Sequence, residues 1–271
     1  MTLSRLTRVA LTAAVIVALI IIYVPLFVVV VNSFNADKAF GWPPTDLTLE
    51  WWRRAASNLG LRSAIWTSVK AAVAATALAL TLGTMASFAA QRYRFFGRGG
   101  VSLLVVLPIA LPGIVTGIAL NNAFNTLLSP LGLGLGLFTV IVGHSTFCIV
   151  VVFNNVQARL RRVGTGLEEA SMDLGADTFT TFRYVTLPVL RSALLAGGLL
   201  AFALSFDEII VTTFTAGAGT VTLPIWIFQN LFRPNQAPIV NVVAALLIVV
   251  SIVPIYIAQR LSGDTSGGGR L

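Results

Sequence analysis

Long apolar stretches alternate with short polar segments along the whole chain. A helix that crosses a membrane needs roughly 20 apolar residues, and six stretches approach or exceed that length. We expect these spans at residues 11–31, 65–90, 101–124, 137–153, 188–216 and 239–258. The pattern therefore predicts an all-α, polytopic membrane protein with six transmembrane helices.

One polar stretch, residues 168–188, has the pattern of two short amphipathic helices rather than that of a solvated linker. Gly175 separates the two helices, and Asp177 stands where the N-cap of the second helix belongs. Apolar residues recur at helical spacing on both sides of the glycine: Leu167, Ala170 and Leu174 before it, Phe179 and Phe182 after it.

Basic residues beside the spans indicate how the chain is oriented, because Lys and Arg are retained on the cytoplasmic side. Six spans place both termini on one side. With the termini inside, eleven of the 18 basic residues are cytoplasmic and five lie outside. The eleven are Arg5, Arg8, Arg92, Arg94, Arg98, Arg159, Arg161, Arg162, Arg183, Arg260 and Arg270.

Tryptophan supports the same orientation, since it prefers the membrane interface. All five tryptophans fall in or beside outer segments: Trp42, Trp51, Trp52, Trp66 and Trp226. We therefore divide the chain into an N-terminal tail with the first helix (1–32), an outer segment (33–64), a five-helix core (65–258) that includes a cytosolic loop (154–187), and a disordered cytosolic tail (259–271).

Composition narrows the possible functions. The chain has 271 residues, 56% of them hydrophobic and 10% charged, with a mean hydropathy of +0.89, which excludes a soluble single domain. The net charge of +8 reflects the cytoplasmic bias of basic residues and indicates no nucleic-acid partner. No G-x-x-x-x-G-K-[ST] phosphate loop occurs, so this chain does not bind ATP in that way.

The chain has one histidine and one cysteine, which excludes histidine-based metal sites and internal disulfides. One histidine, His144, cannot build a histidine-based metal site or an H-E-x-x-H protease, and we expect it to be a hydrogen-bonded packing residue of the fourth span. Cys148 lies inside the same span and has no partner for an internal disulfide. We predict no catalytic residue, no metal and no bound cofactor.

The acidic pair Asp207 and Glu208 lies within the predicted fifth span. A carboxylate in a bilayer costs several kcal/mol and usually faces a cavity or a partner. One interpretation is that a carboxylate faces the path of a solute. The other is that the pair only reaches water or an outer arginine. Adjacent helical positions point about 100° apart, so one carboxylate can face the path while the other pairs structurally.

The third span contains Pro108 and Pro112, four residues apart. Prolines free backbone carbonyls and kink a helix, and such a break can line a translocation path. A packing kink with Gly113 and Gly117 at a close helix contact is the alternative. Asn121 continues the polar character of this span toward its outer end.

The run Glu169-Ala-Ser-Met-Asp-Leu-Gly175-Ala176, followed by Phe182 and Leu187-Pro188, resembles the EAA loop of binding-protein-dependent importer permeases of type I. Ser171 replaces the second alanine of that pattern, and Ser192 stands where a second proline is common. The resemblance implies a type I ABC importer permease fold, with cytosolic coupling helices that insert into a separate ATPase subunit. The residues that would make this contact are Glu168, Glu169, Ala170, Ser171, Asp173, Leu174, Gly175, Ala176, Phe179, Phe182 and Arg183.

A narrower resemblance extends over nearly the whole chain. The second permease subunit of spermidine/putrescine importers is similar in Val31-Asn-Ser-Phe-Asn35, Leu49-Glu-Trp-Trp52, Arg92-Tyr-Arg-Phe95, His144-Ser-Thr-Phe-Cys148 and Ser205-Phe-Asp-Glu208. The same subfamily includes permeases for opines and phosphonates. Polyamine permeases often carry an acidic residue where this chain has Gly113.

The resemblance implies a transport complex in the bacterial cytoplasmic membrane. A second permease subunit, two ATPase subunits that bind ATP and Mg, and an extracytoplasmic solute-binding protein would be its partners, beside membrane lipid. The receptor would dock on residues 33–63, 126–136 and 217–237. We expect the solute path at Asp207, Glu208, Pro112 and Asn121. Two rival classes are a proton-coupled secondary transporter and a membrane enzyme that uses Asp207. Neither explains the coupling-loop pattern.

Overall fold

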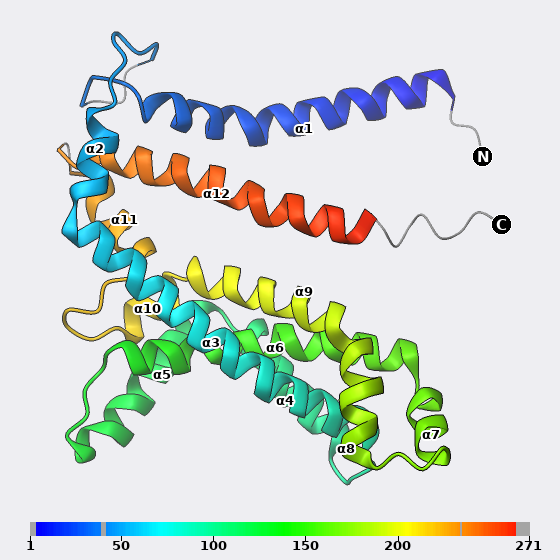
Figure 1. Ribbon diagram of the computed structural model, residues 1–271. Helices are drawn as coiled ribbons and strands as arrows, with labels where there is room; N and C mark the ends of the chain where they lie inside the picture. The colour runs from blue at the N-terminus through cyan, green and yellow to red at the C-terminus, as the bar shows by residue number, and fades with distance from the viewer. Residues whose placement is uncertain (1–3, 39–41, 234, 264–271) are drawn as a thin grey trace. The chain divides into compact units, whose positions relative to one another are not determined.

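The computed structural model describes residues 4–38, 42–233 and 235–263 (Figure 1). Their regular structure is helical, apart from one isolated antiparallel bridge between Asn35 and Leu47. The helices are α1 Arg5–Asn32, α2 Glu50–Ser57, α3 Leu59–Arg92, α4 Arg98–Ala110, α5 Gly113–Leu128, the 3-10 turn η1 Ser129–Leu131, α6 Leu137–Val163, α7 Gly166–Asp173, α8 Thr178–Thr181, the π-helical turn η2 Phe182–Thr186, α9 Leu187–Phe206, α10 Ile210–Thr215, α11 Leu223–Leu231 and α12 Ala237–Gly263.

Most predicted spans correspond to helices of membrane-crossing length. In the described residues, four helices are long and apolar enough to cross a membrane, and a fifth is obtained if α4 and α5 form one bent span. The sixth predicted span lies in α12, whose apolar part at 237–251 is shorter. The all-α membrane class is confirmed. Of the tail predicted to be disordered, residues 259–263 are instead the end of α12, and residues 264–271 lie outside the described part.

The third span is broken rather than kinked. Helices α4 and α5 meet at an angle of 107°, with Leu111 extended between them at φ −82° and ψ 143°. The residue before a proline is pushed out of the α region, and Pro112 then forms the N-cap position of α5. Sequence reasoning found the prolines but underestimated the break.

The fifth span is displaced from its predicted limits of 188–216. One continuous helix runs from Thr178 to Phe206 through the π-helical turn. Proline lacks a backbone N–H, and the wider turn before Pro188 closes with the N–H of Leu187 bonded to the carbonyl of Phe182. The second predicted coupling helix is therefore the first turn of the span itself, not a separate rod.

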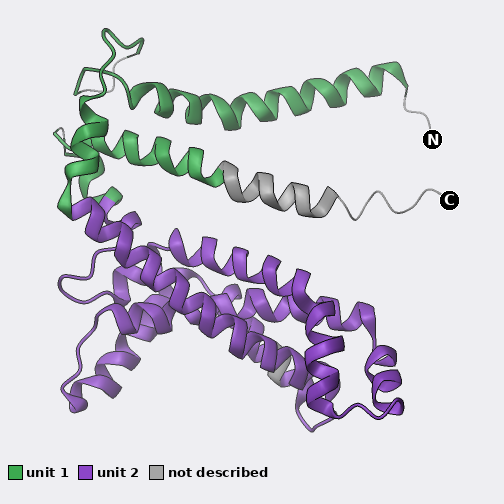
Figure 2. Ribbon diagram, in the orientation of Figure 1, with its two compact units in different colours: residues 1–59, 227–271 green, residues 60–226 purple. Residues whose placement is uncertain are grey.

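Contacts divide the chain into two compact units, residues 1–59 with 227–271 and residues 60–226 (Figure 2). In the first unit, α12 packs on α1 and α2. In the second unit, α6 packs along α9, and α10 packs against both α5 and α6. Small residues allow these close approaches: a Cβ at Gly197 in α9 would lie 3.3 Å from the Cα of Val152 in α6.

Candidate functional site

The turn between α7 and α8 has the tight geometry that its sequence predicts. Gly175 has φ +91°, which is the left-handed conformation that glycine adopts without strain. Its N–H bonds the Met172 carbonyl at 2.9 Å, and the N–H of Ala176 bonds the Ser171 carbonyl at 3.1 Å. This pair of bonds is a Schellman motif, which satisfies the free carbonyls of a helix end.

Asp177 caps the helix that follows, as expected. Its Oδ1 accepts a hydrogen bond from the Thr180 backbone N–H at 2.6 Å. Hydrogen bonds with the Thr180 side chain and, second, with its backbone N–H favour the ionised form, so the pKa of Asp177 is lowered from its ordinary value. The turn and cap together fix the direction in which α8 leaves the loop.

Large apolar side chains are exposed on the α7–α8 hairpin. Leu174 is 90% exposed and Phe179 is 69% exposed. Other exposed apolar residues here are Leu167, Met172, Phe182 and Tyr184. Contiguous exposed apolar area usually marks a contact surface. Of the residues predicted to couple to an ATPase, Glu169, Ala170, Asp173 and Arg183 are also exposed.

Glu168 differs from its neighbours because its carboxylate is directed into the protein. Its Oε2 lies 2.9 Å from Arg92 Nε, and its Oε1 accepts bonds from Arg92 Nη2 at 3.1 Å and from the Thr186 hydroxyl at 3.0 Å. Arg92 Nη2 also donates to the Gly164 carbonyl at 2.7 Å. The cluster therefore joins the end of α3 to α7 and to the π-helical turn.

Met172, Phe179 and Phe182 of the hairpin line a groove of about 1440 Å³ beside α3 and α9. Phe182 closes part of its wall, with its ring 5.8 Å from that of Phe88 in an edge-on arrangement. Ser171 contacts Thr181 through their hydroxyls at 3.1 Å. Phe182 and Ser171 were both predicted to contact an ATPase subunit. That contact stays a prediction beside these contacts within the chain.

The acidic pair lies at a break between two helices. Helix α9 ends at Phe206, Asp207 is its C-cap residue, and α10 begins at Ile210. Glu208 Oε1 accepts the Val211 N–H at 2.8 Å and so caps α10. Asp207 is exposed, and none of the described residues bonds its carboxylate. Of the two carboxylates, that of Glu208 is bonded within the chain and that of Asp207 is exposed.

The breaks of the third and fifth spans lie against each other. A Cβ at Gly113 would be 3.4 Å from Ile210 Cγ2, so the residue after Pro112 touches the first residue of α10. Further along, Asn121 Nδ2 donates to the Phe214 carbonyl at 2.6 Å. That bond ties α5 to α10, and the solute contact expected for Asn121 stays a prediction.

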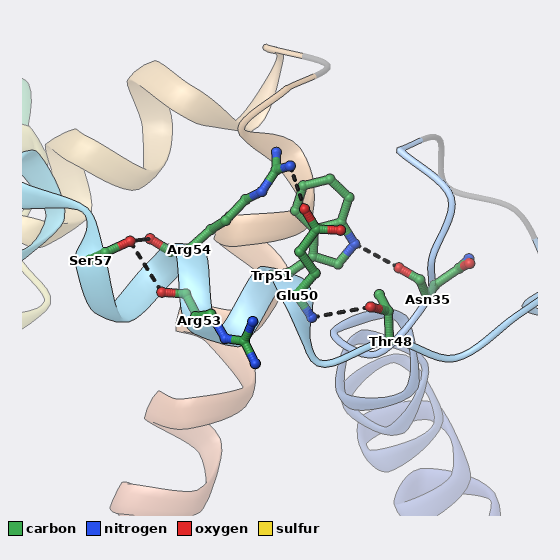
Figure 3. A network of polar contacts seen from close by, with 7 residues as sticks. All are labelled: Asn35, Thr48, Glu50, Trp51, Arg53, Arg54 and Ser57. Atoms are coloured by element: carbon green, nitrogen blue, oxygen red, sulfur yellow. Dashed lines mark hydrogen bonds and ion pairs between the residues drawn. The ribbon is translucent and has the colours of Figure 1, made fainter.

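Two runs of the outer segment, residues 31–35 and 49–52, pack together in the first unit (Figure 3). Trp51 is 3% exposed, and its Nε1 donates to the Asn35 carbonyl at 2.9 Å. The rings of Phe34 and Trp52 stack 5.3 Å apart. Glu50 pairs with an arginine one turn later in α2. These two runs, which carried part of the resemblance, are therefore packed against each other rather than forming an open loop.

Broken apolar helices, an exposed hairpin with an apolar surface and an acidic pair at a helix break define a polytopic membrane permease. A family model described as "Binding-protein-dependent transport system inner membrane component" matches residues 79–264. The chain belongs to this family, and it is a permease subunit of an ABC importer.

Relatives of known name agree with this family. The chain is 33% identical over 249 residues to the spermidine/putrescine transport system permease protein PotC of Shigella flexneri, and 92% of each chain is covered. It is 32% identical over 250 residues to the putrescine transport system permease protein PotI of Escherichia coli (strain K12), covering 88% of this chain and 87% of that protein. It is 28% identical over 247 residues to the putative 2-aminoethylphosphonate transport system permease protein PhnV of Salmonella typhimurium, covering 90% of this chain and 89% of that protein.

A solved structure has the same fold. A chain of a bacterial ABC transporter involved in the import of the acidic polysaccharide alginate matches with a TM-score of 0.69 over 97% of this chain and 99% of that chain. At 17% identity, the likeness concerns the fold alone. It agrees with the predicted type I importer permease fold.

Proposed function

We propose that this chain carries a polyamine, spermidine or putrescine, as one of two permease subunits of an ATP-driven importer. The observation that carries the proposal is the 32–33% identity to PotC and PotI over about nine-tenths of the chain. The availability of Asp207 is in keeping with it. A polyamine keeps its amines protonated at neutral pH, like a lysine with a reference pKa near 10.4, and a free carboxylate in the path offsets that charge.

The remaining partners follow from this assignment. Two ATPase subunits supply ATP and Mg, the second permease completes the path, and an extracytoplasmic binding protein delivers the solute. Both termini face the cytoplasm in this arrangement. Reporter fusions at each terminus, one active only inside and one only outside the cell, test that orientation; an outward terminus would contradict it.

The α7–α8 hairpin is the proposed contact with an ATPase subunit. Its exposed apolar side chains, above all Leu174 and Phe179, fit a groove on that partner. Replacing Phe179 with aspartate should prevent co-purification of the ATPase subunit, because a charge would have to be buried in the contact. The matched control is Phe96→Asp, since Phe96 is an exposed phenylalanine of another loop. Equal retention of the ATPase by both variants would count against the hairpin.

Transport of a polyamine is tested with the complete complex in proteoliposomes, with the binding protein added outside. We expect ATP-dependent uptake of labelled spermidine or putrescine. Asp207→Asn should reduce it, because the protonated amine of the solute would lose a carboxylate partner in the path. A complex that imports neither amine refutes the substrate assignment.

A 2-aminoethylphosphonate is the second candidate, supported by the identity to PhnV and by Gly113, where polyamine permeases often have an acidic residue. This solute carries both an amine and an anion. Uptake of 2-aminoethylphosphonate that persists in Asp207→Asn, with no uptake of either polyamine, would favour this alternative.

A further inference from the structure

The single histidine of the chain connects both sides of the break in the fifth span. His144 belongs to α6 and is 1% exposed. Its Nδ1 lies 2.7 Å from Ser205 Oγ in α9, and its Nε2 lies 2.8 Å from Thr212 Oγ1 in α10. The gap that holds Asp207 and Glu208 lies between those two hydroxyl residues. One side chain therefore holds the helix before the break and the helix after it.

The neighbouring hydrogen bonds determine which ring nitrogen carries the proton. The Thr212 hydroxyl donates to the Glu208 carbonyl at 2.8 Å. A hydroxyl has one hydrogen to donate, so the bond between Thr212 and the ring must come from an Nε2–H. The backbone carbonyl at the break is thus bonded through Thr212 to the imidazole.

The Ser205 side completes the assignment. In a neutral imidazole with its proton on Nε2, Nδ1 can only accept a hydrogen bond. The contact of 2.7 Å between Nδ1 and Ser205 Oγ is then a bond that the Ser205 hydroxyl donates. A neutral imidazole with its proton on Nε2 makes both bonds at once.

Close packing next to the histidine supports the same role. A Cβ at Gly143 would lie 3.3 Å from Val211 Cγ1 and 3.4 Å from Thr215 Cγ2. The absence of a side chain therefore lets α10 lie directly against α6. This contact brings Thr212 within reach of the ring.

We propose that His144 is a positioning residue of the transport path, which sets how the two halves of the fifth span are held across the break. The donor chain runs from the Ser205 hydroxyl to Nδ1, and from Nε2–H through Thr212 to the Glu208 carbonyl. Through these bonds the ring fixes the backbone that presents Asp207. The inference rests on the proposed function only for its transport readout, and it holds for any solute.

The protonation state is directly measurable because the chain has one histidine. We would label the full-length chain with 15N-histidine, purify it with a histidine-free tag, and record the imidazole nitrogens in lipid nanodiscs. We expect one protonated and one unprotonated nitrogen. Thr212→Val should shift the protonated signal, and Ser205→Ala the unprotonated one. A proton on Nδ1 alone, or on both nitrogens, would overturn the assignment without any reference to transport.

The positioning role is tested by two substitutions in the complete complex. His144→Phe keeps a ring but removes both bonds, whereas His144→Gln keeps one acceptor and one donor. We expect His144→Phe to lower the maximal uptake rate about tenfold per assembled complex, as when buried hydrogen-bond partners are left unpaired. The solute concentration for half-maximal uptake should change less, and His144→Gln should recover a large part of the rate. Equal losses in the two variants would refute the proposal.

A third variant keeps the test valid if His144→Phe does not assemble. Thr212→Val removes only the hydroxyl that joins the ring to the break, and it should also lower the maximal rate. Thr213→Val is the matched control, because Thr213 is exposed and bonds its own helix at the Ile209 carbonyl. Equal rates for the two threonine variants would overturn the positioning role. If the wild-type complex imports no solute, the proposed function fails, while the 15N measurement still decides the inference.

Discussion

Replacing Arg92 with glutamine separates two routes by which the hairpin can move the spans. The first route is the covalent one, through the continuous helix from Thr178 to Phe206. The second is the cluster of Arg92 with Glu168, which joins α7 to the end of α3. Arg92→Gln leaves the helix intact and removes the second connection. If α3 is driven through this pair, ATP hydrolysis continues while solute import falls.

The size of the effect follows from the contacts that disappear. Arg92 loses the bond to the Gly164 carbonyl at 2.7 Å, the bond to Glu168 Oε1 at 3.1 Å and the approach of Nε to Oε2 at 2.9 Å. Truncating one partner of a fully buried pair costs about 3–5 kcal/mol. The two side chains here are 14% and 18% exposed, so water relieves part of that cost.

Thr186 continues to donate to Glu168 in the variant, which reduces the loss further. We therefore expect Arg92→Gln to weaken the contact between α3 and α7 by about 2–3 kcal/mol. That free energy corresponds to a factor of roughly 30 to 150 in the equilibrium between the linked and the separated state of these two helices. Solute imported per ATP hydrolysed should fall by a comparable order.

The assay compares ATP hydrolysis and solute uptake in one preparation of proteoliposomes. Arg94→Gln is the matched control, because Arg94 is an exposed arginine of the same connection. A double-mutant cycle with Glu168→Gln isolates the pair, since the two losses should not add. The mechanism is refuted if Arg92→Gln and Arg94→Gln have the same ratio of uptake to hydrolysis, or if the Arg92 and Glu168 losses are additive.

Two further predictions concern packing and capping. Gly117→Ala should destabilise the chain by about 1–3 kcal/mol, because its Cβ would lie 2.6 Å from Phe214 Cδ2; thermal unfolding in detergent measures this, and Gly134→Ala, which meets no atom within 4 Å, should leave the midpoint unchanged. The lowered pKa of Asp177 makes its cap fully effective at neutral pH, and the contribution is lost as the pH falls through that lowered pKa. Asp177→Asn keeps an acceptor that does not titrate. The wild type should therefore be more stable to thermal unfolding than this variant at neutral pH, and the difference should disappear in acid. A difference in stability that persists in acid would contradict the capping argument.

Local patterns were sufficient for the hairpin. Helical spacing on both sides of Gly175, together with Asp177 at the cap position, predicted the turn that the structure contains. Glycine at a positive φ and an aspartate N-cap act within a few residues, so their effect is visible in sequence. The same reasoning located the prolines at the break of the third span.

Contacts between distant segments were not predictable in this way. Arg92 was counted only as a cytoplasmic charge, yet it lies 76 positions from its partner Glu168. Nothing local in the sequence distinguishes it from Arg94. The end of the fifth span was also misplaced, because hydropathy continues through α10 while the backbone turns at Asp207. In the sequence, an acidic residue that caps a new helix looks the same as one that lies within a continuous span.

The helix from Thr178 to Phe206 has the coupling surface at one end and the break at the other. Its 29 residues correspond to a length of about 43 Å at 1.5 Å per residue, close to the thickness of a bilayer with its headgroups. A rod of that length converts a tilt at Phe179 into a displacement at Asp207. The displacement is defined only if the far end is held against its neighbours, and the contact of α10 with Gly113 supplies one such constraint. The bonds of His144 supply another, so the proposed coupling to an ATPase and the proposed presentation of Asp207 depend on the same helix.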